Sequence, residues 1–578
     1  MRYVRSSLVG SSSLLLILVS IAPGVAQTPL PIPDTLSGSV IDLTMQEGTW
    51  EFHPGQPVMT FGYNGDLLGP TLILNKGQEV TLNVTNQLEE LTTTHWHGLH
   101  VDPHNDGGPH SIITPGSTWS PSFTVLDRAS TFWYHPHVHG MTDFQVSMGL
   151  AGMIIVRDQY EAALDLPRTY GVDDIPLILQ AKAVVEDYIA LHTGLDSIVL
   201  ANGVRDAVAD VPAQVVRLRC LNGASERTFF LGFSNGMNFH VIGTDGGLLS
   251  APVTVDRLQL MPGERVELLV DLASMNGQQF QLMAYNSELP NGIIGSAQVG
   301  NGMTTLDGYD ENALNGADFP LVTFNVVPAT SDPVTNIPTA LVATDPFTEG
   351  DATVTREFLF EPQEMTPMEM IEGPFLINGE LFDMDVMNEV VELGATEIWS
   401  FTNNTQVGHP IHIHDIQFNI LDRNGLPPQP WESGWKDVVF VPPMGTARVI
   451  TRFDDFADPM TPYMFHCHLL MHEDEGMMGQ FLVVDPTGIS EQAGHPSLII
   501  APNPISDGTC RISGQKMQGL LKAEVIDGSG RVISSRQVFA TENAFNLELG
   551  TLGTGTYLLR IGDGAGHITF GKMNVINN

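Results

Sequence analysis

The stretch HCHLLMHEDEGMM at residues 466–478 decides how the rest of the chain is interpreted. Three further histidine motifs precede it: HWHG at 95–98, WYHPHVHG at 133–140 and HPIHIHD at 409–415. Each motif holds a His-x-His pair, although chance placement of 19 histidines in 578 residues would give fewer than one such pair on average. Residues i and i+2 of a strand share one face, so each pair would direct two imidazoles to one site. The motifs therefore predict metal sites carried on β-strands.

Together the four pairs supply eight imidazoles, from His95, His97, His135, His137, His412, His414, His466 and His468. Eight neutral imidazoles that converge would suit a cluster of borderline metal ions such as copper. Structural zinc prefers four-coordinate sites of Cys and His and would leave half of these ligands unused. Copper is therefore the expected metal.

The residues around Cys467 predict a second, separate site. Cys467 lies between the two histidines of its pair, so its sulfur should point to the opposite face of the strand. His409 is out of phase with the pair that follows it, and His472 and Met477 come five and ten residues after the cysteine. One thiolate, two imidazoles and a thioether form the ligand set of a blue-copper electron-transfer site.

The order and spacing of the motifs resemble the three-domain multicopper oxidases, which include laccases, cuprous oxidases and bilirubin oxidases, over roughly residues 40–486. The resemblance implies four copper ions: type 1 held by His409, Cys467, His472 and Met477, type 2 by His95 and His412, and a type 3 pair by His97, His135 and His468 on one ion and His137, His414 and His466 on the other. It also implies that a reductant gives up electrons singly at the type 1 ion, and that O2 is reduced to water at the other three.

Reduction of O2 to water consumes protons, so carboxylates are expected near the cluster. By the same resemblance, Asp106 matches an acid beside the type 2 copper, and Glu473 matches an acid that feeds protons toward the type 3 pair. The alternative for both is an exposed loop carboxylate. The expected catalytic residues are Asp106, Glu473 and Cys467, the last as the electron link.

Outside the motifs the chain reads as strands separated by turns, with 57 glycines and 38 prolines. Segments such as QEVTLNVTN (78–86) and RVELLVDL (265–272) alternate apolar and polar residues. The expected fold is all-β, with three cupredoxin-like Greek-key β-sandwich domains and a small C-terminal β-sandwich. The expected boundaries are 1–26 for a signal peptide, 27–158, 159–335 and 350–487 for the three domains, and 498–578 for the C-terminal domain.

Composition and the first residues indicate where the protein acts. The chain carries 66 acidic and 25 basic residues, a net charge of −41, so phosphate backbones would be repelled and nucleic acid is excluded as a partner. Arg2 and Arg5, the apolar run 14–22 and the small residues 24–26 predict a secretory signal peptide. No later segment has 18 consecutive apolar residues, so no transmembrane segment is expected.

The segment 498–578 carries no metal motif. Its opening LIIAPNPISDG and its strand GTYLLRI resemble the C-terminal sorting domain of the type IX secretion system. The resemblance implies a protein of a Gram-negative bacterium that crosses the periplasm and is then secreted or attached to the cell surface by that machinery. The alternative is an ordinary accessory β-domain.

The sequence leaves the reducing substrate open. A laccase-like range of phenols and aromatic amines is the first expectation, because the Met/His-rich insertion of dedicated cuprous oxidases is missing. Met365, Met368 and Met370 keep Cu(I) or another metal ion as the alternative reductant, since thioethers bind Cu(I) well. A secreted protein that binds copper without turnover is the alternative from another class. One chain would supply every ligand, so a monomer suffices.

Overall fold

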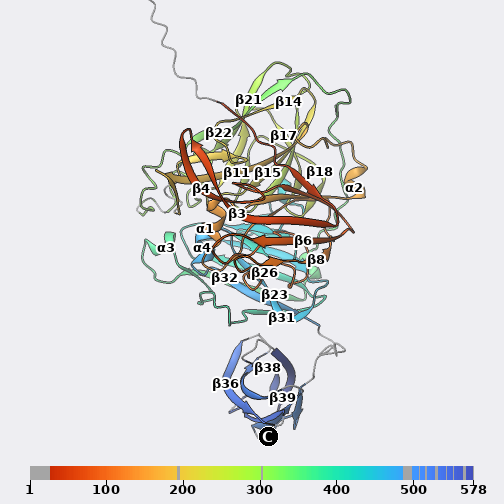
Figure 1. Ribbon diagram of the computed structural model, residues 1–578, viewed down its shortest axis with the longest axis vertical. Coiled ribbons are helices and arrows are strands. Elements are labelled where there is room, and N and C mark those ends of the chain that lie inside the picture. Colours follow the sequence, from red (N-terminus) through yellow and green to blue (C-terminus); the bar gives the residue numbers. More distant parts are fainter. Residues whose placement is uncertain are drawn as a thin grey trace, which may run out of the picture.

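The computed structural model describes residues 27–485 and 498–576, apart from 192–195, 301, 303, 507, 515–516, 528–530, 542, 551 and 564–567. The expected signal peptide, 1–26, lies outside the described residues. Figure 1 shows strands packed into a large body, with a smaller blue β-domain beneath it. Among the described residues no helix has the length and apolar character needed to cross a membrane. The all-β prediction is confirmed.

The first sandwich packs two sheets around a core that includes Phe61, Leu82 and Phe132. One sheet has the strand order β2-β5-β10-β9 and the other β4-β3-β6-β7, with β8 paired to β6. Their bounds are β2 (Thr35–Ser37), β3 (Val40–His53), β4 (Gln56–Tyr63), β5 (Thr71–Asn75), β6 (Glu79–Asn86), β7 (Thr118–Trp119), β8 (Ser122–Thr124), β9 (Ser130–Tyr134) and β10 (Gly152–Arg157).

The middle sandwich pairs a seven-stranded sheet with a six-stranded one. The first holds β11 (Asp174–Val185), β12 (Tyr188–Ala190), β13 (Ile198–Ala201), β15 (Val215–Asn222), β17 (Phe239–Thr244), β18 (Gly247–Val255) and β20 (Arg265–Asp271). The second holds β1 (Thr28–Pro29), β14 (Ala207–Pro212), β16 (Phe229–Phe233), β19 (Leu258–Leu260), β21 (Gln279–Tyr285) and β22 (Asp318–Val327). Because β1 pairs with β14, the first described residues join the middle sheet rather than the first sandwich.

The third sandwich packs two five-stranded sheets around Trp399, Ile411 and Phe465. One contains β23 (Val354–Pro362), β24 (Phe375–Ile377), β26 (Thr396–Asn403), β28 (Asn419–Arg423) and β30 (Thr446–Arg452). The other contains β25 (Glu389–Glu392), β27 (His409–Ile413), β29 (Val438–Val441), β31 (Asp458–Cys467) and β32 (Met478–Val484). Ile294 and Tyr309, which follow the middle strand β21, are buried in this third core, so the middle and third sandwiches share an apolar interface.

The helices are short: α1 (Thr142–Met148), α2 (Gln159–Ala162), α3 (Glu369–Glu372) and α4 (Leu470–Asp474), with 3₁₀ turns at Asn286–Glu288, Glu349–Asp351 and Pro430–Glu432. The helices α1 and α4 meet across the first and third sandwiches, because the backbone N–H groups of Thr142 and Asp143 donate to the carboxylate of Asp474 at 2.9 Å. This contact places α4, which carries His472, beside the first sandwich.

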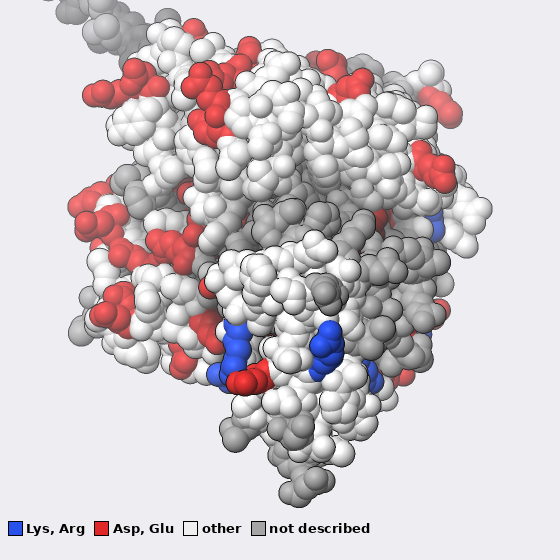
Figure 2. All heavy atoms as spheres, turned by 60° about the horizontal axis from the view of Figure 1, so that its bottom comes forward, with Lys and Arg blue, Asp and Glu red and all other residues white. Residues whose placement is uncertain are grey.

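The C-terminal domain has a core of its own, which includes Ile512, Val525 and Leu559. Its sheets hold β33 (Ile499–Ala501), β34 (Thr509–Ser513) and β37 (Ala544–Glu548), and β35 (Gly519–Ile526), β36 (Val532–Ala540), β38 (Gly555–Asp563) and β39 (Ile568–Val575). Residues 498–578 carry six acidic and seven basic residues, a net charge of +1, whereas residues 1–497 carry 60 and 18, a net charge of −42. Figure 2 shows acidic side chains over much of the body in that view.

Candidate metal centre

Four residues predicted for one site come together at the end of the third sandwich; we call His409, Cys467, His472 and Met477 the sulfur group. The Sγ atom of Cys467 lies 3.5 Å from Nδ1 of His409 and 3.8 Å from Nδ1 of His472. The backbone N–H of Cys467 donates to the carbonyl of Met477 at 3.0 Å, which folds the chain after α4 back beside the cysteine. His472 is 3% exposed, whereas the other three side chains are fully buried.

The sulfur group is packed by an aromatic ring and is contacted by a threonine at His409. Thr405 Oγ1 lies 2.8 Å from Nε2 of His409, which directs Nδ1 of that ring toward the sulfur. The ring of Phe375 packs edge-on against His409 and His472 at 4.8 and 4.7 Å. Burial raises the pKa of the Cys467 thiol well above its usual value and lowers the pKa of His472 to about 3. A bound cation would instead lower the pKa of the Cys467 thiol, because a metal ion deprotonates a coordinating thiol.

The eight histidines of the four pairs also come together, between the first and third sandwiches; we call them the eight-histidine group. All eight are at most 1% exposed. The expectation that every pair lies within a strand is wrong: the first two pairs lie outside the strands, and β27 and β31 end at Ile413 and Cys467, one residue before His414 and His468. His95 and His135 form an isolated bridge outside the strands, and the chain turns at Gly98, whose φ is +88°. Glycine adopts this backbone conformation without strain.

Nitrogen atoms within the eight-histidine group lie close enough to share metal ions. Mutual distances of at most 4.8 Å join three sets: His95, His412 and His414; His97, His135 and His468; His137, His414 and His466. The last two sets are the two predicted for the type 3 pair. The predicted type 2 ligands, His95 and His412, belong to the first set together with His414.

The donor atoms of the eight-histidine group have the properties that copper requires. Burial lowers the pKa well below its usual value in His97, His135, His137, His412, His414 and His468, so these rings are neutral and their nitrogens can bind metal. The buried Nε2 atoms of His95, His412 and His468 have no hydrogen-bond partner within the described part of the chain. Buried nitrogens without partners are costly unless something else binds them, and neutral imidazoles suit copper.

Asp106 lies directly behind two of these rings and is 2% exposed, so the exposed-loop alternative is wrong for it. Its Oδ2 atom is 2.8 Å from Nδ1 of His414, and its backbone carbonyl is 2.8 Å from Nδ1 of His95. Both contacts hold the Nδ1 side of the ring and leave Nε2 toward the centre of the group. Gly107 follows with a φ of +78°, and a Cβ there would lie 1.8 Å from the carbonyl oxygen of Thr94, so the turn requires glycine.

Glu473 lies on the other side of the group, buried in α4, so it is not an exposed loop carboxylate either. Its Oε2 atom is 3.0 Å from Nδ1 of His466, and its Oε1 atom is 3.4 Å from Nδ1 of His137. Burial acts to raise the pKa of Glu473, but the two histidines outweigh it and hold the pKa below its usual range. The carboxylate is therefore the form that the site favours.

The sequence did not point to a third carboxylate, Asp437, which lies just before β29. Its Oδ1 atom is 3.2 Å from Nε2 of His97, and its backbone carbonyl is 2.8 Å from Nδ1 of His412. A buried arginine of the middle sandwich, Arg265, pairs with it. No local pattern in the sequence marks Asp437, because its partners His97 and Arg265 are 340 and 172 residues away along the chain.

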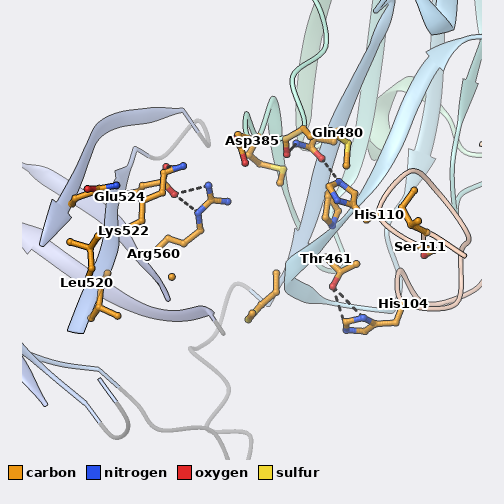
Figure 3. A pocket seen from close by; sticks show the side chains of 18 of the residues that line it. His104, His110, Ser111, Asp385, Thr461, Gln480, Leu520, Lys522, Glu524 and Arg560 are labelled. Carbon is orange, nitrogen blue, oxygen red and sulfur yellow. Dashed lines mark hydrogen bonds and ion pairs between the residues drawn. The ribbon is translucent and has the colours of Figure 1, made fainter. Parts of the chain in front are cut away.

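The other histidines near the motifs lie outside the group. His100 pairs with Asp415 and Asp455, and His139 packs its ring against Phe382. His104 and His110 line a cavity of about 890 Å³ between the body and the C-terminal domain. Figure 3 shows these two histidines on one side of that cavity and Lys522, Glu524 and Arg560 of the C-terminal domain on the other.

Cys220 and Cys510 are also buried, each in the core of its own domain, so neither belongs to the sulfur group. The methionines considered as ligands for a Cu(I) substrate are more exposed to solvent: Met365 is 70% exposed and Met368 is 39% exposed. The sulfur of Met370 lies 3.7 Å from Nε2 of Gln406. Gln406 precedes His409 by three residues. Met370 lies within α3 and Met365 and Met368 precede that helix, so it is Met370 that brings this segment to Gln406, whose backbone N–H also donates to the Met370 carbonyl at 2.9 Å.

Comparison with known proteins identifies the family. Profiles described as multicopper oxidase match residues 44–161, 199–306 and 352–487, and one described as a secretion system C-terminal sorting domain matches 500–576. Multicopper oxidase Mco of Staphylococcus haemolyticus is 32% identical over 453 residues, 77% of this chain and 88% of that protein. Cell division protein FtsP of Escherichia coli is 31% identical over 471 residues, 79% of this chain and 93% of that protein.

Solved structures agree with these matches. The laccase-like multi-copper oxidase CueO from Ochrobactrum sp. is 36% identical, covers 79% of this chain and 100% of its own, and superposes with a TM-score of 0.71. McoA of Aquifex aeolicus is 30% identical, covers 80% and 100%, and gives a TM-score of 0.69. The sandwiches of the body are thus cupredoxin-like, as predicted. The chain belongs to the multicopper oxidase family and carries a secretion sorting domain at its C-terminal end.

Proposed function

We propose that this protein is an exported, laccase-like oxidase that binds four copper ions and couples the oxidation of phenols or aromatic amines to the reduction of O2 to water. One observation carries the proposal: the sulfur group and the eight-histidine group are both complete, and the Cys467 motif belongs to both. A protein that only stores copper needs no such covalent link between two sites.

The ligand assignment follows the sets described above. The sulfur group would hold the type 1 ion, His95 and His412 the type 2 ion, and the remaining six histidines the type 3 pair, three to each ion. When bound, copper would supply one-electron acceptance at the first site and four-electron reduction of O2 at the others. The chain supplies the route between them, because Cys467 is bonded through the backbone to both His466 and His468.

His472 is the expected point of electron input. Its 3% exposure gives the sulfur group its contact with solvent, while His409, Cys467 and Met477 are closed off. Met477, as a thioether ligand, would give the type 1 ion a moderate reduction potential, because the axial ligand tunes that potential.

Asp106 and Glu473 are the candidate proton carriers. Both carboxylates are buried within hydrogen-bond reach of proposed ligands, Asp106 at His414 and Glu473 at His466. Each would hold its imidazole in the tautomer that leaves the other nitrogen free, and each could pass a proton to water forming nearby.

The laccase-like range rests on the sequence, which lacks the Met/His-rich insertion of dedicated cuprous oxidases. Met365 and Met368, two of the candidate ligands for a Cu(I) substrate, are 70% and 39% exposed. Cu(I) remains the second candidate because Met370 reaches Gln406 beside the sulfur group. The net charge of −42 on residues 1–497 would favour neutral or cationic reductants over anionic ones.

Oxygen uptake by the copper-loaded protein tests the proposal. We expect uptake with a phenol, in the ratio of one O2 to four substrate electrons. Uptake only with Cu(I) held by a weak chelator would assign the metal-ion oxidase role and make Met365, Met368 and Met370 the next residues to replace. Full copper content without uptake from either would favour a binding protein instead; similarity to a protein named for cell division makes that test necessary.

We further propose the domain boundaries 27–158, 159–335, 350–487 and 498–578, and a signal peptide at 1–26. The C-terminal domain would deliver the oxidase, as a monomer, from the periplasm of a Gram-negative bacterium to its surface or medium. Deleting residues 498–578 should trap an active oxidase in the periplasm, because the copper groups are formed without this domain. Unchanged export of the truncated protein, measured by fractionation, would contradict the sorting role.

A further inference from the structure

A buried ion pair links all three sandwiches beside the eight-histidine group. Nη1 and Nη2 of Arg265, at the start of β20 in the middle sandwich, donate to Oδ1 and Oδ2 of Asp437 in the third, both at 2.6 Å. Nε of Arg265 donates to the carbonyl of Thr131 in β9 of the first sandwich at 3.0 Å. Neither side chain of the pair is exposed. Two parallel charge-assisted bonds fix both orientation and distance.

Asp437 also contacts two rings of the eight-histidine group, one through its side chain and one through its backbone carbonyl. Its Oδ1 atom lies 3.2 Å from Nε2 of His97, and its backbone carbonyl lies 2.8 Å from Nδ1 of His412. The rings of His97 and His412 stack at 3.7 Å with 9° between their planes. Asp437 is therefore the common support of two neighbouring rings that belong to different sandwiches.

The contact with Asp437 decides which nitrogen of His97 is available. A neutral imidazole has one N–H donor and one free nitrogen, and the hydrogen bond at one nitrogen sets the other. Because Nε2 of His97 meets a carboxylate, the proton belongs there. Nδ1 is left free, 3.3 Å from Nε2 of His135, within the set that also includes His468.

The backbone of the first sandwich is shaped to admit the pair. A Cβ at Gly98 would lie 2.4 Å from Oδ2 of Asp437 and 2.6 Å from Nη2 of Arg265. Gly98 directly follows His97, so the ion pair packs against the loop that carries this histidine. A side chain at position 98 would force the pair and the ring apart.

We propose that Arg265 and Asp437 are positioning residues that hold His97 with Nδ1 directed at its copper ion, so that the middle domain, which contributes none of the twelve proposed ligands, sets the copper affinity of the eight-histidine group. The inference rests on the copper sites proposed above. The competing explanation is a buried ion pair that stabilises the fold alone.

Asp437→Asn, which keeps the size of the side chain, tests this with copper retention as the readout. The protein is loaded, then dialysed against chelators of increasing strength, and copper per chain is measured. The blue absorption of the sulfur group in the same molecules is the internal reference. We expect about 10- to 100-fold weaker copper retention by the eight-histidine group, the usual effect of removing a partner behind a metal-bound histidine, with the blue absorption unchanged.

Arg265→Lys should shift retention in the same direction, and the double variant should lose no more than Asp437→Asn alone, because both residues act through one contact. The matched control is Glu432→Gln, which breaks the bidentate pair of Glu432 with Arg423 at 2.7 Å in the third sandwich. We expect Glu432→Gln to lower the unfolding temperature of the metal-free protein. The ratio of bound copper to the blue absorption of the sulfur group should stay at the wild-type value.

Wild-type retention in Asp437→Asn and Arg265→Lys would overturn the inference, and so would parallel loss of both copper groups together with the fold. If Asp437→Asn does not fold without metal, Gly98→Ala replaces it in the same experiment. The added methyl group would crowd the Arg265–Asp437 ion pair without removing its charges, and copper retention by the eight-histidine group is again compared with the blue absorption. A wild-type protein that binds no copper would instead overturn the proposed function, so the two failures are distinguishable.

Discussion

The two proposed copper groups are built from very different parts of the chain. The sulfur group takes all four residues from 409–477, within one sandwich, and is packed by the ring of Phe375 and contacted by Thr405 at His409. The eight-histidine group takes four residues from each of two sandwiches, and Asp106, Glu473 and Asp437 contact its rings. Under the proposed function this difference would separate the tasks: one group would accept electrons without protons, and the other would have carboxylates where protons are consumed.

Cys467→Ser should produce the largest effect and separate the two groups. A hydroxyl cannot replace the thiolate of a blue site, so we expect loss of the blue absorption and at least about a 1,000-fold loss of turnover. Copper in the eight-histidine group should remain, measured as copper per chain. The control is Cys220→Ser, which changes a buried cysteine of the middle core and should keep the blue absorption. Loss of copper from both groups in Cys467→Ser would contradict their independence.

Asp106→Asn should act on the eight-histidine group alone. The amide keeps the shape but cannot carry a proton, so kcat should fall roughly 100-fold, the usual contribution of a proton carrier. Reduction of the blue site by substrate without O2 should proceed at the wild-type rate in stopped flow. Asp102→Asn, in the same loop, is the control. Slower reduction of the blue site in Asp106→Asn would show that the two groups are not separable in this way.

The smallest effect is expected at His100, which borders the eight-histidine group without belonging to it. Burial acts to lower the pKa of His100, but Asp415 and Asp455 outweigh it and raise the pKa well above its usual value. The ion pairs of His100 therefore stabilise the folded protein fully at pH values below the pKa of an unfolded histidine, about 6.5. This stabilisation is lost as the pH rises through the higher pKa that His100 has in the folded protein.

His100→Gln should accordingly lower the unfolding temperature of the metal-free protein by a few degrees near pH 6.5, and by less at alkaline pH. His104→Gln serves as the control, because its contact with Asp458 at 2.9 Å is made by a side chain that is 67% exposed. A destabilisation that grows with pH would have the wrong sign and would reject the ion pair as its cause.

The same contrast explains how much the sequence could predict. In the sulfur group, Cys467 follows from strand parity, His472 and Met477 follow from their short spacings after it, and His409 follows from being out of phase with the pair His412 and His414. The eight histidines also follow, because each pair is local, although only His412 and His466 of the eight lie within strands. Arg265 and Asp437 are separated by 172 residues and share no motif, so no local pattern joins them.

The partners of the carboxylates show the same limit. The sequence pointed to Asp106 and Glu473 through family resemblance, but not to their partners, His414 at 308 residues from Asp106 among them. Such pairings depend on how two sandwiches dock. The fold class follows from alternating segments within each sandwich, whereas the docking depends on contacts such as those of Asp474 with the N-terminus of α1.

The most direct test of the account is the oxygen electrode with the purified, copper-loaded full chain, with copper per chain measured on the same sample. The account predicts four copper ions per chain, a blue absorption, and uptake of one O2 for every four electrons taken from a phenol. A fully loaded protein that bleaches its blue colour with the phenol but consumes no O2 would contradict it, because electrons would then reach the sulfur group and go no further.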